Sequence, residues 1–302
     1  MVSLLGLRKS FNPPHLPSFL ALSYMLTLSG CFSVNVGGID VNNNERISSF
    51  ISESLTGQRD PLLVYEALPN YLLLIDKAID NDPDNGQLLI AGSDLYILYS
   101  LFFEDNPKRN TQLTHFALAY ADRSLCLAII DLCNPSEINY QDFIIQLQAT
   151  NIDDIDILYS YSLASLSYIK ASGADWRGIA FLPWIQKMLE RIVELDDTYK
   201  KGSAYAYLGI LNGLRPPALG GNIHLSEAYF LKAISYSEEK NLYAKVDYAR
   251  YVAMTLFDQD LHDRLLNEVI DAHVDDVDFN LFNNLAKQHA ALLLEQSENY
   301  FN

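Results

Sequence analysis

The sequence predicts an all-α protein of about eleven helices, packed as helical hairpins. Three observations support this fold class. From Glu45 onward, apolar residues recur at the three- and four-residue spacing of an amphipathic helix. No segment alternates apolar and polar residues as a half-buried strand does. Glycine, proline and aspartate interrupt the pattern at intervals that suit helices of ordinary length. We therefore expect residues 45–302 to form a single helical domain.

The first 30 residues are typical of a signal peptide. Arg8 and Lys9 precede an uncharged stretch whose apolar residues are densest over residues 16–28. The apolar part, residues 16–28, is shorter than the roughly 20 residues that a transmembrane helix needs, and it contains Pro17. We expect residues 1–30 to be removed on export.

The signal peptide ends in a lipobox. Residues 28–30 (Leu-Ser-Gly) precede Cys31, and lipoprotein signal peptidase requires small residues directly before its cysteine. The alternative is a chance cysteine behind an ordinary signal peptide. Acyl chains such as palmitate on Cys31 would anchor the protein to a membrane without spanning it. Because Phe32 is not the aspartate that favours inner-membrane retention, we expect a periplasmic lipoprotein of the outer membrane. Residues 31–44 are polar and aperiodic, as in a flexible tether.

The charge of the chain excludes nucleic acid as a partner. Its 21 basic and 38 acidic residues give a net charge of -17. Removal of residues 1–30 takes away two basic residues and no acidic ones, so the mature chain carries 19 minus 38, or -19. Such a chain repels a phosphate backbone.

The cysteines beyond Cys31 are Cys126 and Cys133, both in an apolar segment with helical spacing. Seven residues of continuous helix separate two side chains by about 10 Å along the axis, which is too far for a disulfide. The sequence therefore predicts two reduced cysteines in the core.

An internal repeat indicates a duplicated helical hairpin. The pair Leu68-Pro69 and the acidic helix end that follows it are echoed by the pair Leu182-Pro183 and the residues after it. Each copy leads through a glycine-marked turn into a helix rich in tyrosine and leucine. A proline within a helical pattern predicts that each of these helices starts or kinks at its proline.

A third unit is closer to the tetratricopeptide pattern of paired helices. The matching residues are Tyr205, Leu208 and Gly209 in the first helix and Ser226, Phe230 and Ala233 in the second. The glycine lets the paired helices approach closely, and the aromatic residue fills the space between units. The connection is longer than the standard repeat provides, and its extra residues form the loop 215–222. The expected fold is therefore a tetratricopeptide-like superhelix of helical hairpins.

Around this loop the chain resembles the T-component lipoproteins of tripartite ATP-independent periplasmic (TRAP) transporters. The resemblance rests on Leu208-Gly209, on the Pro-Pro-Ala-Leu-Gly-Gly turn of residues 216–221, and on the acidic-aromatic helix with its Phe-Leu-Lys-Ala core at residues 230–233. It covers most of the mature chain and is clearest over residues 179–266. It implies cryptic tetratricopeptide repeats, a homotrimer with a channel or cleft through each subunit, and pairing with a solute-binding protein.

Two acidic segments have the residue types of a metal site without the spacing. Residues 80–86 begin like an EF-hand loop, yet Asn85 stands where glycine is needed and Ala91 where glutamate is needed. We interpret the segment as a turn between helices. Residues 271–278 combine aspartates with His273, but their loose spacing favours a solvated loop and helix N-cap. We expect no metal and no cofactor.

The chain lacks the motifs of enzymes. It has no nucleophile elbow, no His-Glu-x-x-His, no phosphate-binding glycine loop and no paired-cysteine zinc spacing. Beyond the predicted signal peptide and the acidic segment, the histidines at residues 115, 224, 262 and 289 are scattered over different helices. We expect a binding protein, not an enzyme.

The candidate binding residues lie in and near the loop 215–222. Most of the 19 tyrosines are expected to pack between helices, with a minority lining a binding surface. Arg215 either binds an anionic group or caps the preceding helix. Prolines and paired glycines hold the loop in one shape, which favours binding, although the loop could simply set the angle between helices. The predicted binding residues are Tyr205, Arg215, Pro217, Leu219, Gly220, Gly221 and Asn222.

Two functions remain open from the sequence. The first is a transport accessory lipoprotein that docks a TRAP solute-binding protein and holds an apolar or amphiphilic small molecule. The second is a tetratricopeptide scaffold lipoprotein for envelope protein assembly. The proline- and glycine-rich loop favours the first, because a generic scaffold has no need of it.

Overall fold

The structure of the chain, a computed structural model, describes residues 54–173 and 176–302. Every regular element in these residues is a helix, which confirms the predicted all-α class. The predicted signal peptide, the lipobox cysteine Cys31 and the predicted tether lie outside the described residues.

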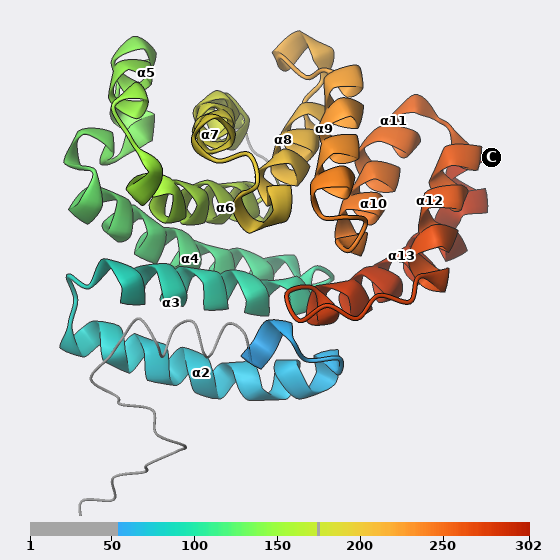
Figure 1. The fold of residues 1–302 in the computed structure, drawn as a ribbon, viewed down its shortest axis with the longest axis horizontal. Helices are drawn as coiled ribbons and strands as arrows, with labels where there is room; N and C mark the ends of the chain where they lie inside the picture. Colours follow the sequence, from blue (N-terminus) through green and yellow to red (C-terminus); the bar gives the residue numbers. More distant parts are fainter. Residues whose placement is uncertain (1–53, 174–175) are drawn as a thin grey trace, which may run out of the picture. The chain divides into compact units, whose positions relative to one another are not determined.

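The helices follow one another closely along the described chain (Figure 1). The α-helices are α2 (Pro61–Asn81), α3 (Gly86–Ser100), α4 (Pro107–Ala128), α5 (Tyr140–Gln148), α6 (Ile155–Ala171), α7 (Trp176–Leu195), α8 (Ser203–Leu214), α9 (Ile223–Tyr236), α10 (Leu242–Tyr248), α11 (Met254–Leu256), α12 (Gln259–Asp271) and α13 (Asn280–Phe301). The 3₁₀ turns are η1 (Leu101–Phe103), η2 (Ile130–Leu132), η3 (Pro135–Glu137), η4 (Ile152–Asp154), η5 (Tyr199–Gly202) and η6 (Pro217–Leu219). A π-helix, η7 (Ala249–Ala253), joins α10 to α11 without a break.

Side-chain caps set where many of these helices begin. The side chain of Asn85 accepts a hydrogen bond from the backbone N–H of Leu88 at 3.1 Å, and α3 begins at the next residue. The predicted turn within residues 80–86 is therefore confirmed as the connection between α2 and α3. Asp258 caps α12 in the same way, with its carboxylate 2.9 Å from the N–H of Leu261.

Packing between sequence neighbours dominates the fold. α2 packs on α3, α3 on α4, α4 on α6, α6 on α7, α7 on α8 and α8 on α9, and Figure 1 shows α2, α3 and α4 side by side. Such nearest-neighbour contact is typical of stacked helical hairpins. The segment Gly86–Phe103 is apolar enough to cross a bilayer, yet α3 packs against α2, α4 and α6 and contributes many core residues, as a core helix does.

The α8–α9 hairpin has the close contact that the tetratricopeptide pattern predicts. A β-carbon at Gly209 would lie 2.9 Å from the ring of Phe230, so only glycine permits this approach. The Ser226 hydroxyl donates to the carbonyl oxygen of Gly209 at 2.7 Å. Phe230 itself is fully buried, and replacing such a residue by alanine costs about 3 to 5 kcal/mol.

The two repeated prolines lie inside their helices. α2 begins at Pro61 and contains Pro69, while α7 begins at Trp176 and contains Pro183. The prediction that these helices start at the repeated prolines is therefore wrong. The start of α2 is set instead by Asp60, whose carboxylate accepts a hydrogen bond from Leu62 N–H at 2.9 Å, with a proline suitably placed at the first helical position. A kink at either proline stays a prediction.

The prediction of two reduced cysteines is wrong, because Cys126 and Cys133 form a disulfide. It assumed that one helix runs through both residues, but α4 ends at Ala128 and Ile129 leaves the helical conformation with φ -131° and ψ 77°. The turn η2 then reverses the chain, so the two α-carbons lie 4.3 Å apart. The helix ends between the two cysteines, so the separation expected for a continuous helix does not apply to them.

The first described residues form polar contacts with the start of α13 and with the connection before it. The side-chain amide of Asn280 donates to the carbonyl oxygen of Gly57 at 3.3 Å, and Arg59 pairs with Asp275. α2 and α13 are also in contact. The two ends of the described chain therefore support each other.

Candidate functional site

The predicted loop 215–222 folds back on the end of α8. The backbone N–H of Gly221 donates to the carbonyl oxygen of Pro216 at 3.1 Å, and that of Asn222 donates to Asn212 at 3.1 Å. Gly220 has a φ of 84°, in the left-handed region that favours glycine. The Asn222 side chain caps α9 by accepting from Leu225 N–H at 3.1 Å. The loop is therefore a well-bonded turn.

The predicted binding residues of this region divide into exposed and buried groups. Pro217, Leu219, Gly220 and Asn222 are exposed and Gly221 is half-buried, whereas Arg215 and Tyr205 are buried. The Tyr205 ring stacks with Tyr229 and Tyr236 of α9, and lies on α8 about 15 Å along the axis from the loop. The structure thus brings the loop residues together and leaves Tyr205 apart from them.

The Arg215 side chain holds the start of the loop against α7 and α8. Its Nε donates to the carbonyl oxygen of Leu211 at 3.0 Å, so it caps the end of α8, which is one of the two roles considered for it. Its Nη2 donates to the side-chain oxygen of Gln186 on α7. Burial lowers the pKa of Arg215, opposed by the charge of Glu190. The side chain therefore ties two helices and a loop end together.

A second group of charged and tyrosine side chains, which we call the inner cluster, gathers between helices far apart in the sequence. Its members come from α3, the residues after η1, α6, η5, α8, α10, η7 and α13. They are Asp94, Glu104, Tyr159, Lys170, Lys200, Tyr207, Tyr243, Asp247, Arg250, Tyr251 and His289.

One end of the inner cluster is a trio of Asp94, Tyr159 and Lys200. The Lys200 ammonium lies 4.6 Å from the centre of the Tyr159 ring, a cation–π distance. Burial raises the pKa of Asp94, against the lowering effect of Lys200 and of a 3.4 Å hydrogen bond from Ser160. Burial lowers the pKa of Lys200, but Asp94 and Tyr159 outweigh it and the pKa is raised.

The other end is a second trio of Asp247, Tyr251 and Lys170. The Lys170 ammonium lies 5.8 Å from the centre of the Tyr251 ring. The pKa of Lys170 is raised by Tyr251 first and by Asp247 as well, although burial opposes the shift. Burial raises the pKa of Asp247, while Lys170 and Arg250 lower it. Both trios therefore combine one lysine, one tyrosine face and one aspartate.

Tyr207 and α6 connect the two trios. The ring centres of Tyr207 and Tyr159 are 6.0 Å apart, and burial raises the pKa of Tyr207 well above its usual value, with added effects of Tyr159, Asp247 and Asp94. α6 carries both Tyr159 and Lys170. Eleven residues of α-helix make about three full turns, so these two residues lie on one face of α6. Their backbone positions are about 16 Å apart along the axis.

Beside the second trio lies a smaller hydrogen-bonded group. The Glu104 carboxylate is 3.9 Å from both Arg250 Nη1 and His289 Nδ1. The Tyr243 hydroxyl is 2.7 Å from the same His289 nitrogen. Burial lowers the pKa of His289, and the charge of Glu104 opposes this shift. Glu104 therefore lies close to both Arg250 and His289.

Lys170 and Lys200 reach water although protein surrounds their ammonium groups. Both residues are exposed along their side chains, while the charges and rings of several helices lie close by. Within the part of the chain that the structure describes, neither ammonium has a carboxylate oxygen within 4.0 Å. Each aspartate of a trio thus acts electrostatically on its lysine without forming a direct ion pair.

The backbone is irregular at both trios. Lys200 and Lys201 have φ values of 44° and 56°, a conformation that is costly for residues with a β-carbon. The next residue, Gly202, also has a positive φ. At the other trio, the π-helix η7 carries Arg250 and Tyr251. Strained backbone and π-helical turns are both enriched at functional sites.

Sequence reasoning did not single out the lysines and acids of the inner cluster, because they are far apart along the chain. The excess of tyrosine was the available signal, since several of the cluster's rings belong to it. A second signal was the Lys200-Lys201 pair before Gly202 in a strongly acidic chain. Neither signal says which helices meet.

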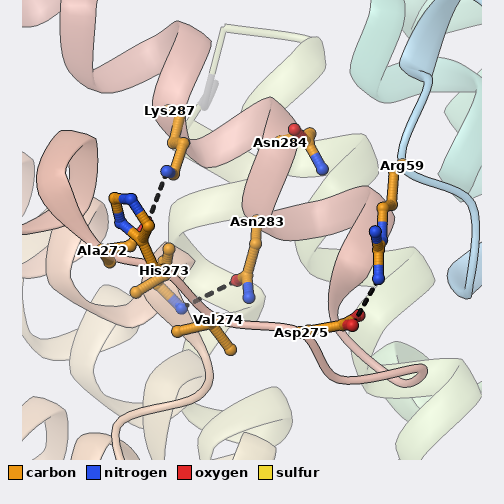
Figure 2. A pocket seen from close by; sticks show the side chains of 9 residues that line it. Arg59, Ala272, His273, Val274, Asp275, Asn283, Asn284 and Lys287 are labelled. Atoms are coloured by element: carbon orange, nitrogen blue, oxygen red, sulfur yellow. Dashed lines mark hydrogen bonds and ion pairs between the residues drawn. The ribbon is translucent and has the colours of Figure 1, made fainter.

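A separate pocket of about 350 Å³ lies where Arg59 meets the connection between α12 and α13 (Figure 2). Its polar groups are already engaged: Lys287 donates to Ala272 at 2.6 Å, and Asn283 accepts from Leu242 N–H at 3.0 Å. We interpret it as a structural joint between the chain ends.

The acidic segment 271–278 is only partly the solvated loop that the sequence predicts. Asp275 and Asp278 are exposed, but Asp276 is partly buried and lies 3.1 Å from the Lys201 ammonium. The residue that caps α13 is Phe279, without a side-chain hydrogen bond. Within residues 54–173 and 176–302 no group of three or more metal-ligating side chains is present.

Residues 57–301 match the sequence model of a family described as TRAP transporter T-component. No curated protein matches the chain. The matched residues include the whole inner cluster and the whole loop 215–222.

Proposed function

Because the chain belongs to the TRAP transporter T-component family, we propose that it is a periplasmic accessory lipoprotein of a TRAP-type transport system. In this proposal it docks a solute-binding protein and holds an apolar or amphiphilic small molecule. Residues 45–302 act as one helical domain, and the chain has no catalytic role.

The inner cluster is the observation that carries the small-molecule part of the proposal. Lysine, aspartate and tyrosine side chains from several helices converge there, and convergent polar groups beside aromatic faces are typical of small-molecule sites. Lys170 and Lys200 lack a direct carboxylate partner among the described residues. Lys200 is held by strained backbone, and Tyr251 by a π-helix. Strained backbone and π-helical turns of this kind are enriched at ligand-binding sites.

The loop 215–222 supports the docking part. Its exposed tip includes Pro217 and Leu219, and the exposed fraction of Leu219 is 52%. Buried Arg215 and the hydrogen bonds of Gly221 hold that tip in one conformation. A surface that is ordered before binding loses less entropy on association.

Docking is tested with matched leucine variants. Leu219 and Leu231 have the same exposed fraction, 52%, but Leu231 lies on α9 away from the loop. Leu219→Ala should weaken binding of the TRAP-type solute-binding protein of the same cell by about tenfold in titration calorimetry, because an apolar contact is lost. Leu231→Ala should leave the affinity unchanged. Equal affinities for both variants and the wild type would remove the loop from the docking surface.

The disulfide supports export, which the lipobox also predicts. Disulfides persist in oxidising compartments such as the periplasm, and Cys126 and Cys133 are joined. We propose that Cys31, which lies outside the described residues, is acylated and anchors the chain to the outer membrane. Cys31→Ser should move the protein from the membrane to the soluble fraction, and retention in the membrane without a bound partner would contradict the anchor. The proposed homotrimer is checked by sedimentation velocity.

A tetratricopeptide scaffold lipoprotein for envelope assembly is the second candidate. The packing of each helix on its sequence neighbours favours it, because such stacks offer long binding surfaces. A scaffold would bind envelope proteins equally well after substitution of Lys170 and Lys200. Loss of a small-molecule ligand in those variants would distinguish the two functions.

A further inference from the structure

The two trios of the inner cluster present the same chemistry twice. In each, a lysine ammonium stands over a tyrosine ring, at 4.6 Å for Lys200 and 5.8 Å for Lys170. In each, an aspartate from another helix lies nearby but outside ion-pair distance, Asp94 in the first and Asp247 in the second. Each trio therefore offers an ammonium and a carboxyl group, held apart from each other, beside a flat aromatic surface.

Few types of small molecule satisfy such an arrangement. An apolar molecule would displace water from both charges and return no hydrogen bonds. A simple carboxylate would pair with the lysine and leave the aspartate unpaired, and a simple amine would do the reverse. A molecule with both groups pairs its carboxylate with the ammonium and its ammonium with the aspartate. The tyrosine ring then packs against the rest of the molecule.

The distance between the trios decides how many molecules bind. Tyr159 of the first trio and Lys170 of the second share one face of α6, about 16 Å apart along its axis. One small zwitterion cannot bridge that distance. Two separate molecules can occupy the two trios at once.

We propose that the inner cluster binds small zwitterions with the charge pattern of free α-amino acids, one molecule at each trio. This inference rests on the proposed function, in that the chain holds a small molecule. Of the two ligand types considered there, it selects the amphiphilic one over the apolar one.

Titration calorimetry with the whole mature chain tests the proposal. Free L-amino acids are added one at a time, and at least one should bind saturably with two molecules per chain. The N-acetyl and amide derivatives of the best binder each lack one of the two charges. Both should bind at least about tenfold more weakly, since one charge of each trio then stays unpaired.

Single variants assign the two sites. Lys170→Met and Lys200→Met should each reduce the stoichiometry from two to one. Lys232→Met is the matched control, because the Lys232 ammonium also stands over a tyrosine ring, that of Tyr205 at 4.9 Å, outside the inner cluster. Asp247→Asn is a second variant of the Lys170 site and should give the same stoichiometry as Lys170→Met. Circular dichroism checks that each variant is folded.

Several outcomes would overturn the proposal. They are the absence of saturable binding by any free amino acid, equal affinity for the singly charged derivatives, or an effect of Lys232→Met as large as that of Lys170→Met. Binding of the solute-binding protein is measured with the same variants. Intact docking without amino-acid binding would reject the zwitterion sites alone, whereas lost docking with intact amino-acid binding would reject the docking part of the proposed function.

Discussion

Gly221 packs so closely beneath Arg215 that a β-carbon at residue 221 would lie 1.8 Å from the Arg215 carbonyl oxygen. No side chain fits there unless the backbone moves, so this contact fixes the fold of the loop 215–222. At the neighbouring Gly220 the space is open, because a β-carbon there would lie 3.8 Å from its nearest neighbour, an Arg215 nitrogen. Only the φ of 84° disfavours other residues at that position.

The two glycines should therefore respond differently to alanine. Gly221→Ala should lower the free energy of unfolding by about 3 kcal/mol through backbone overlap. Gly220→Ala should lower it by about 1 kcal/mol through the left-handed conformation alone. Urea unfolding of both variants measures the difference. Equal losses would mean that the loop moves freely enough to relieve the overlap.

The disulfide between Cys126 and Cys133 should stabilise the chain by about 2 to 3 kcal/mol, because it closes a short loop in the unfolded chain. The double variant Cys126→Ser/Cys133→Ser should lose that amount in urea unfolding. A reductant should lower the stability of the wild type to the same level and leave the double variant unchanged. A reductant effect on the double variant would place the stabilisation elsewhere.

Asp122 should make the stability of the fold depend on pH. Burial raises its pKa to about 6, against the opposing charge of His115. Because the folded state then holds the proton more tightly than the unfolded state, stability falls as pH rises from about 4 to 6. Asp122→Asn removes this cost, so it should gain up to about 3 kcal/mol over the wild type at pH 7 and little at pH 4. The exposed Asp84→Asn variant is the control for urea unfolding at both pH values. A gain of Asp122→Asn that is equal at pH 4 and pH 7 would contradict the assignment.

The adjacent lysines of η5 should respond differently when replaced by glycine. Both are in the left-handed region, so glycine relieves strain at either position. Lys200 has no direct ion pair among the described residues, so Lys200→Gly should raise the free energy of unfolding by about 0.5 kcal/mol after the loss of its contact with the Tyr159 ring. Lys201 lies 3.1 Å from Asp276 and 2.8 Å from Asp278, and Lys201→Gly should bring no gain because these pairs are lost. Thermal unfolding of the two variants decides this, and a stabilising Lys201→Gly would refute it.

The parts of the fold that could be predicted are those in which near neighbours decide the structure. Apolar spacing locates the helices, Asn85 marks the turn before α3, and Gly209 with Phe230 marks the close α8–α9 contact. In each case the residues that decide the structure belong to one helix or to two consecutive helices. Their spacing in the sequence is therefore enough to predict the contact.

The parts that could not be predicted depend on where the chain turns or on which distant helices meet. Cys126 and Cys133 join because α4 stops at Ala128, and a helical pattern alone does not show that stop. Asp94 and Lys200 come near each other because α3 packs on α6 and Tyr199 of η5 contacts the Tyr159 ring of α6, which no local pattern encodes. The sequence therefore points to the loop 215–222, whereas the inner cluster is visible only in the tertiary structure.

The contacts between the two ends of the described chain constrain the order of folding. Gly57 and Asn280 are separated by 223 positions, yet they share a hydrogen bond, and Arg59 pairs with Asp275 across 216 positions. Contacts of such long sequence separation form late, since the intervening chain must first be ordered. Residues that leave the ribosome first would thus wait for the last ones to arrive. Until α13 emerges, the amino-terminal helices lack their final neighbours, and a chain cut short before Asn280 would expose them to proteases.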